Sequence, residues 1–284
     1  MWRKKLGFSI GQSFGLSIPE AVQLVKASGF DALSPEWKPD GSHLEYIAAA
    51  KECELVLQSL HAPFLKAKDM WGTDEAKGNE AVEELLHCLR DCAEHGIPVM
   101  VVHAYIGFND HEPTPQGLER YGQVVDAAAS CGVRIAFENT EGEEFLYALM
   151  EHFEGNATVG FCWDSGHEMC YNHFQDLLSR FGDRLLITHL NDNLGIRDFD
   201  GNITWLDDLH LLPFDGVADW DSNAARLKKA ACPEILNFEL GRKSKPGRHE
   251  NDLYEKMTAE EYLAECYKRA CRVAVKLLQN KYTD

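Results

Sequence analysis

The 284-residue sequence is poor in positive charge and has no long apolar run. Lysine and arginine number 28 against 46 aspartates and glutamates, so the formal net charge at pH 7 is −18. This charge repels nucleic-acid phosphates and anionic membranes, and argues against both as partners. No stretch reaches the roughly 20 apolar residues of a membrane span. Ser9, Gln12 and Ser13 interrupt the run that a secretory signal would need, so we expect a cytoplasmic protein.

Two motifs are also missing. The nine cysteines include no CxxC pair, so we interpret them as reduced thiols in the core rather than as disulfides or metal ligands. No G-x-G-x-x-G motif follows an early strand, which argues against an open doubly wound sheet that binds a dinucleotide. We expect no organic cofactor.

Short apolar runs alternate with helical patterns along the whole chain. They predict eight strands, at residues 6–10, 30–33, 55–61, 98–103, 134–138, 158–164, 185–190 and 235–240. Several runs are continuously apolar, which is typical of parallel strands covered on both faces. Eight such units close most simply into a (β/α)₈ TIM barrel, and we expect a single α/β domain over residues 1–284. Four helices are predicted to begin with capping boxes, at Ser17–Glu20, Ser42–Glu45, Thr140–Glu143 and Thr258–Glu261.

Acidic and imidazole side chains follow the predicted strands at their carboxyl ends, where a barrel gathers side chains into one pocket. The strand ends carry His61, His103, Glu138, Asp164, His189 and Glu239, and His167, Asp208 and His210 follow in the next segments. Such groups repel one another or stay desolvated unless a cation joins them. Oxygen and imidazole ligands without thiolate suit Mn²⁺, Co²⁺, Mg²⁺ or Zn²⁺. We therefore predict one divalent-metal site, with the ligands Glu138, Asp164, His189 and Glu239.

Five motifs carry a resemblance to a known family: "FENT", "WDSGH", "HLNDN", "HLLPFDGVADW" and "FEL", in this order and at these intervals. The chain resembles the xylose-isomerase-like superfamily of metal-dependent barrels. That superfamily holds sugar and sugar-phosphate isomerases and epimerases, such as the tagatose 3-epimerases, and zinc endonucleases that incise abasic DNA. The resemblance implies that the four predicted ligands bind one ion and that His167 and His210 face the substrate. Self-association into a homo-oligomer is a further expectation from the resemblance.

The endonuclease branch stays open as an alternative. Its additional zinc ligands have counterparts in His61, His103, His167, Asp208 and His210. The acidity of the chain, "SIGQSF" at the end of the first strand and "LPFDG" without a Gly-x-Gly favour the isomerase branch instead. In the isomerase interpretation, His61 and His103 contact the substrate, and Arg197 is a candidate for contact with a substrate hydroxyl or phosphate.

The chemistry expected of an isomerase is proton transfer through a metal-stabilised enediolate. The ion polarises a carbonyl, and Glu138 and Glu239, on strands across the barrel, move a proton as base and acid. Aldose–ketose isomerisation, epimerisation and a sugar or inosose dehydratase all remain open. The basic segment "GRKSKPGRHE" either binds phosphate oxygens, of a sugar phosphate or of a DNA backbone, or is a solvated loop. Trp37 and Trp71 either stack on a sugar or pack in the core.

Overall fold

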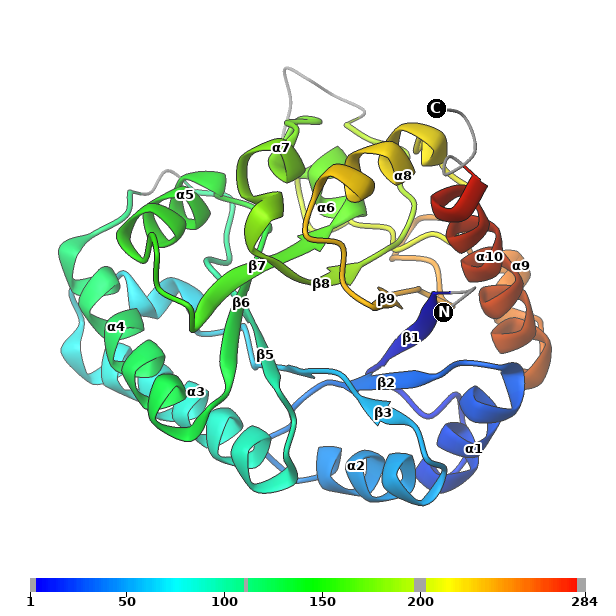
Figure 1. The fold of residues 1–284 in the computed structure, drawn as a ribbon, viewed down its shortest axis with the longest axis horizontal. Coiled ribbons are helices and arrows are strands. Elements are labelled where there is room, and N and C mark those ends of the chain that lie inside the picture. The colour runs from blue at the N-terminus through cyan, green and yellow to red at the C-terminus, as the bar shows by residue number, and fades with distance from the viewer. Residues whose placement is uncertain (1–3, 110–111, 197–202, 280–284) are drawn as a thin grey trace.

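The computed structural model describes residues 4–109, 112–196 and 203–279. Nine parallel strand segments lie at the centre of the molecule and helices surround them (Figure 1). The strands are β1 (Lys5–Ile10), β2 (Ala32–Pro35), β3 (Val56–Leu57), β4 (Leu60–His61), β5 (Val99–His103), β6 (Arg134–Glu138), β7 (Val159–Asp164), β8 (Leu185–His189) and β9 (Ile235–Phe238). The predicted strand at 55–61 is therefore two short segments rather than one.

The helices follow the strands in alternation, as a (β/α)₈ chain requires. They are α1 (Ile18–Ser28), α2 (His43–Glu52), α3 (Glu75–His95), α4 (Pro115–Cys131), α5 (Glu143–His152), α6 (Ser165–Cys170), α7 (Leu177–Phe181), α8 (Trp220–Lys229), α9 (Asp252–Glu255) and α10 (Ala259–Gln279). The described residues also include two 3₁₀ turns, η1 (Ala67–Met70) and η2 (Gly182–Arg184). In the parts of the chain that the structure describes, no helix is long and apolar enough to cross a membrane.

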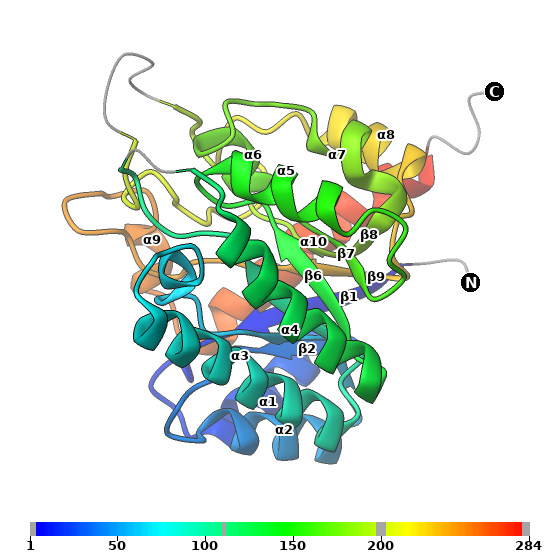
Figure 2. The same cartoon turned by 90° about the vertical axis from the view of Figure 1, so that its left-hand side faces the viewer.

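The strands close into a ring. One run of neighbours is β3-β2-β1-β9 and the other is β4-β5-β6-β7-β8, with every pair parallel. Parallel bridges join the two runs at both seams, between Glu36 and His61 and between Leu190 and Phe238. The break between β3 and β4 lets one piece of chain pair with β2 and the next piece with β5. The predicted (β/α)₈ barrel is confirmed, and Figure 2 shows the segment between β9 and α9 projecting at the end toward which the strands run.

Two of the four predicted capping boxes form. At Ser17–Glu20 and Thr258–Glu261, the hydroxyl accepts from the glutamate N–H and the carboxylate accepts from the N–H of the capping residue. The prediction is wrong at Ser42, whose side chain makes no capping hydrogen bond. It is also wrong at Thr140, because α5 is capped by Gly142 and the Thr140 hydroxyl donates to the Tyr105 carbonyl instead.

The inside of the barrel is filled from alternate positions of β5 to β8. A small apolar cluster lies there, formed by Val99, Val101, Ala136, Cys162 and Ile187. Side chains along a strand point to opposite faces in turn, so the next inward position on each strand is two residues further on. Those next positions are the strand ends His103, Glu138, Asp164 and His189. The alternation that fills the barrel thus also brings polar side chains to its mouth.

Candidate metal centre

Four predicted ligands meet at the mouth of the barrel. One ligand atom from each of Glu138, Asp164, His189 and Glu239 lies within 4.8 Å of the others. Glu138, Asp164 and His189 end β6, β7 and β8, and Glu239 follows β9. The first three are at most 1% exposed, so the cluster is removed from bulk water on one side.

The donor set fits a divalent cation. Nδ1 of His189 lies 2.7 Å from a carboxylate oxygen of Glu138 and 2.7 Å from one of Glu239, although an imidazole nitrogen carries at most one proton. Burial opposes charge on both glutamates, but His189 outweighs it, lowering the pKa of Glu138 well below its usual range and that of Glu239 to about 2. Burial raises the pKa of Asp164 to about 6. A divalent cation would take the place of the His189 Nδ1 proton, which both glutamates now contact. It would also offset the repulsion between the carboxylates.

Asp164 is held in place by its neighbours. One carboxylate oxygen accepts from the His167 N–H at 2.7 Å, which caps α6, and the other accepts from the Asn191 side-chain amide at 2.8 Å. Asn139 binds the Asp164 backbone, accepting from its N–H and donating to its carbonyl. Such partners set the direction of a ligating carboxylate. Both carboxylate oxygens of Asp164 therefore accept a hydrogen bond, and the carboxylate still lies among the other candidate ligands.

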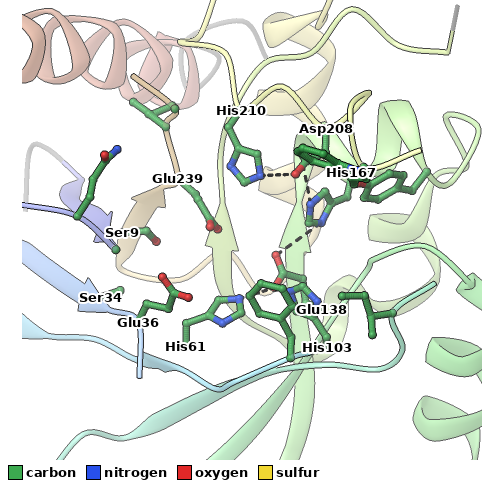
Figure 3. A pocket seen from close by; sticks show the side chains of 18 of the residues that line it. Ser9, Ser34, Glu36, His61, His103, Glu138, His167, Asp208, His210 and Glu239 are labelled. Atoms are coloured by element: carbon green, nitrogen blue, oxygen red, sulfur yellow. Dashed lines mark hydrogen bonds and ion pairs between the residues drawn. The ribbon is translucent and has the colours of Figure 1, made fainter. Parts of the chain in front are cut away.

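Two further groups of donors flank the quartet. His61, His103 and Glu138 form one, and His167, Asp208 and His210 form the other, each with ligand atoms within 4.8 Å (Figure 3). Nδ1 of His61 lies 2.8 Å from the Ala62 carbonyl and Nδ1 of His167 lies 3.0 Å from the Asn139 carbonyl. Each of these rings therefore donates from Nδ1 and turns Nε2 toward a carboxylate, 3.3 Å from Glu138 for His61 and 3.5 Å from Asp208 for His167. A bond at one ring nitrogen orients metal-ligating histidines in the same way.

In the second flanking group, formed by His167, Asp208 and His210, the imidazoles and the carboxylate shift one another's pKa values. Burial disfavours charge, yet Asp208 raises the pKa of His210 to about 9, and Asp164 with Asp208 raises the pKa of His167 well above its ordinary value. His210 and His167 in turn hold the pKa of Asp208 well below its usual range. One oxygen of Asp208 is buried and accepts no hydrogen bond. This group is thus a second place where a cation or a substrate hydroxyl would satisfy unpaired donors and acceptors.

A cysteine thiol also lies close to the candidate metal ligands. The Cys162 thiol lies beside Glu138 and His189, but burial raises its pKa far above neutrality. Binding a cation through this sulfur would require loss of the proton that burial retains, so we take carboxylate oxygen and imidazole nitrogen as the candidate ligands.

A cavity of about 760 Å³ opens above the cluster. Its wall includes Glu138, Glu239, His61, His103, His167, Asp208 and His210, and it also includes the aromatic side chains of Phe8, Phe14, Phe64, Phe108, Tyr171 and Trp205. Asp164 and His189 are not part of the wall. The two glutamates are thus the members of the quartet that a molecule in the cavity would touch.

The structure brings together all the predicted site residues except one. Arg197 lies outside the described residues. The tryptophans Trp37 and Trp71 are core residues, because their indole N–H groups donate to Asp91 and to the Ala104 carbonyl, and neither lines the cavity. Trp205 lies in the wall instead, in a segment whose sequence carried no strand or motif signal.

The basic segment after β9 does not point its charges into the cavity as a group. Arg242 donates to the carbonyls of Tyr254 and Met257, and Arg248 pairs with Glu250 and the Leu206 carbonyl. Lys245 alone among the basic residues of this segment lines the cavity. Both arginines instead stabilise the loops around the mouth.

The fold and this donor cluster define a class, that of (β/α)₈ barrels with a candidate divalent-metal centre at the carboxyl ends of the strands. Residues 22–274 match the family described as "Xylose isomerase-like TIM barrel", and the chain belongs to this family. A relative in Sinorhizobium fredii (strain NBRC 101917 / NGR234), "Uncharacterized protein y4fM", is 28% identical over 266 residues, covering 78% of this chain and 80% of the relative.

Solved structures share the barrel at low sequence identity. The IOLI protein with a bound zinc atom is 20% identical, over 99% of this chain and 100% of that chain, with a TM-score of 0.71. An L-ribulose 3-epimerase is 14% identical, over 99% and 96%, with a TM-score of 0.72. A xylose isomerase-like TIM barrel/4-hydroxyphenylpyruvate dioxygenase fusion protein is 15% identical with a TM-score of 0.70, and the match covers 98% of this chain but 44% of that longer chain.

Proposed function

We propose that the protein is a divalent-metal-dependent sugar isomerase or epimerase. One observation carries the proposal: the cavity reaches Glu138 and Glu239, while Asp164 and His189 of the same ligand cluster lie beneath them. A substrate in the cavity would therefore meet two carboxylates at the point where a cation fits. No organic cofactor is needed for proton transfer between such groups.

The bound ion would polarise a substrate carbonyl and offset the negative charge that develops when the adjacent C–H loses its proton. Glu138 and Glu239 reach the cluster from β6 and from the end of β9, and a carboxylate oxygen of each lies 2.7 Å from Nδ1 of His189. Both have lowered pKa values and are therefore ionised carboxylates at neutral pH. His167 and His210, in the cavity wall, are placed to bind substrate oxygens.

Two of the solved structures support this choice of chemistry. One carries zinc in a barrel of the same fold, and another is named as an epimerase of L-ribulose, a ketose. The pocket of this chain contains the combination that such chemistry uses, namely carboxylates, imidazoles and a candidate cation site.

The test has two parts. First, the purified protein is analysed for metal, and we expect about one divalent ion per chain. Second, the metal-loaded protein is incubated with a panel of ketoses and ketose phosphates in D₂O, and we expect deuterium to enter a carbon next to the carbonyl of at least one of them. Exhaustive chelation should abolish this exchange. Exchange that survives chelation, or no exchange with any sugar, would contradict the proposal.

A second candidate function is zinc-dependent cleavage of a phosphodiester, as at an abasic site in DNA. The two donor groups that flank the quartet favour it, because each adds imidazole and carboxylate ligand atoms that lie within 4.8 Å of one another. Several zinc ions held this way would activate water and bind phosphate oxygens. The net charge of −18 opposes it by repelling DNA. Three zinc ions per chain, together with cleavage of an abasic oligonucleotide, would favour the endonuclease over the isomerase or epimerase.

A further inference from the structure

The wall of the cavity across from His167 and Asp208 carries three polar side chains that the proposed reaction does not use. They are Ser9 in β1, Ser34 in β2 and Glu36 directly after β2, and Figure 3 shows them on the left of the cavity. Ser9 and Ser34 are partners in the register of β1 and β2, which places the two hydroxyls side by side.

Ser34 has an unsatisfied hydroxyl. The residue is 3% exposed, and its side-chain oxygen has no hydrogen-bond partner. Buried polar groups are nearly always hydrogen-bonded, because an unpaired one has lost its water without replacement. Since Ser34 lines the cavity, a ligand there can supply the missing partner.

The two neighbours of Ser34 also have hydrogen-bonding capacity left. Ser9 accepts from the Asn237 side chain at 2.7 Å, so its own hydroxyl proton remains to be donated. One carboxylate oxygen of Glu36 pairs with Lys38 at 2.7 Å. The other lies over Gly11, where an added Cβ would come within 2.5 Å of it. The absence of a side chain at Gly11 thus leaves room for this acceptor beside the two hydroxyls.

The chemistry of these groups selects hydroxyl ligands over anionic ones. A sugar hydroxyl both donates and accepts, so it can donate to Glu36 while accepting from Ser9 or Ser34. A phosphate only accepts at its anionic oxygens and would face the Glu36 carboxylate. Among the described residues, Lys245 is the one lysine or arginine in the cavity wall, and its ammonium lies 3.6 Å from Asp208. Glu36 is the charged side chain among the three on this part of the wall, so a phosphate placed against them meets negative charge.

We propose that Ser9, Ser34 and Glu36 form a subsite for the hydroxyl groups of an unphosphorylated sugar, at the end remote from the reacting carbon. This inference rests on the proposed function, because it takes the substrate to be a sugar bound at the metal centre. Contacts at the remote end position the reacting carbon against Glu138 and Glu239. The subsite determines which sugars bind and rejects their phosphate esters.

The experiment measures equilibrium binding to the Mn²⁺-loaded protein by calorimetry. The probes are D-fructose, D-tagatose and L-ribulose, each paired with its terminal phosphate ester. We expect at least one free ketose to bind about tenfold or more tightly than its ester. For that ketose, Ser34→Ala should raise Kd about three- to tenfold and Glu36→Gln about tenfold or more, as for loss of a neutral and a charge-assisted hydrogen bond.

Ser59→Ala is the matched control. Ser59 is also a buried serine, 1% exposed, with an unpaired hydroxyl, but it does not line the cavity. We expect its loss to leave Kd unchanged. Equal effects of Ser34→Ala and Ser59→Ala, tighter binding of the esters, or no binding of any free ketose would overturn the subsite.

The same samples separate this inference from the proposed function. Deuterium exchange is followed beside binding for each variant. Binding that depends on Ser34 and Glu36 without any exchange would leave the subsite standing and contradict the isomerase or epimerase proposal. Suppose instead that the protein exchanges deuterium but its ketose Kd is unchanged in Ser34→Ala and Glu36→Gln. That result would support the isomerase or epimerase proposal and contradict the subsite.

Discussion

Gly166 makes room for the side chain that orients a predicted metal ligand, and Gly166→Ala tests this arrangement. Asn191 donates to one carboxylate oxygen of Asp164 at 2.8 Å. A Cβ at position 166 would lie 1.8 Å from the Asn191 side-chain oxygen. That oxygen would have to retreat by about 1.6 Å to reach an ordinary contact of 3.4 Å. The Asn191 backbone cannot follow easily, because its N–H and carbonyl are both bonded to the Ser165 hydroxyl.

The size of the effect follows from the bond that is lost. A hydrogen bond of 2.8 Å that lengthens by even half of that displacement is beyond hydrogen-bond range. A buried hydrogen bond to a charged group contributes about 1.5–3 kcal/mol. Loss of a partner that orients a ligand weakens metal binding by about 10- to 100-fold. We therefore expect Gly166→Ala to lower Zn²⁺ affinity by that factor, measured by competition with a chromophoric chelator at pH 7.

Two variants complete the experiment. Asn191→Ala removes the same hydrogen bond without adding bulk, and should weaken Zn²⁺ binding by a similar factor. Gly122→Ala is the control, because an added Cβ in that turn of α4 has nothing within 4 Å. It should raise the free energy of unfolding by up to about 1 kcal/mol and leave Zn²⁺ affinity unchanged. Wild-type Zn²⁺ affinity in a folded Gly166→Ala or Asn191→Ala protein would refute the role assigned to Asn191.

Further outcomes can be stated for proton transfer and for packing. Glu239→Gln should slow deuterium exchange by at least about 100-fold, and wild-type exchange would remove Glu239 from proton transfer. Gly117→Ala should lower the free energy of unfolding by about 1–3 kcal/mol in urea titrations, because its Cβ would lie 2.0 Å from the buried Trp71 ring. Unchanged stability of that variant would show that α4 and η1 can separate without cost.

The sequence by itself determined the barrel and the order of polar residues around its mouth. Continuous apolar runs such as 98–103 and 158–164 are typical of a parallel sheet covered on both faces. Once eight such runs close into a ring, the period of two along each strand carries Glu138, Asp164 and His189 to one place. Their convergence was predictable because it depends on local periodicity and on chain closure, and on no particular loop conformation.

Tertiary structure alone decided what surrounds those residues. The sequence left the segment after β9 open between a phosphate-binding and a solvated loop. In the structure, Arg242 and Arg248 bond to carbonyls far along the chain, and Lys245 lines the cavity. Trp205 and Ser34 enter the cavity wall, while Trp71 packs against α4. The hydroxyls of Ser17 and Thr140 have the same sequence spacing to a glutamate, but the second is drawn to the Tyr105 carbonyl. In each case the alternative contacts of a side chain differ in free energy by about one hydrogen bond. Residues distant in sequence therefore decide which contact forms.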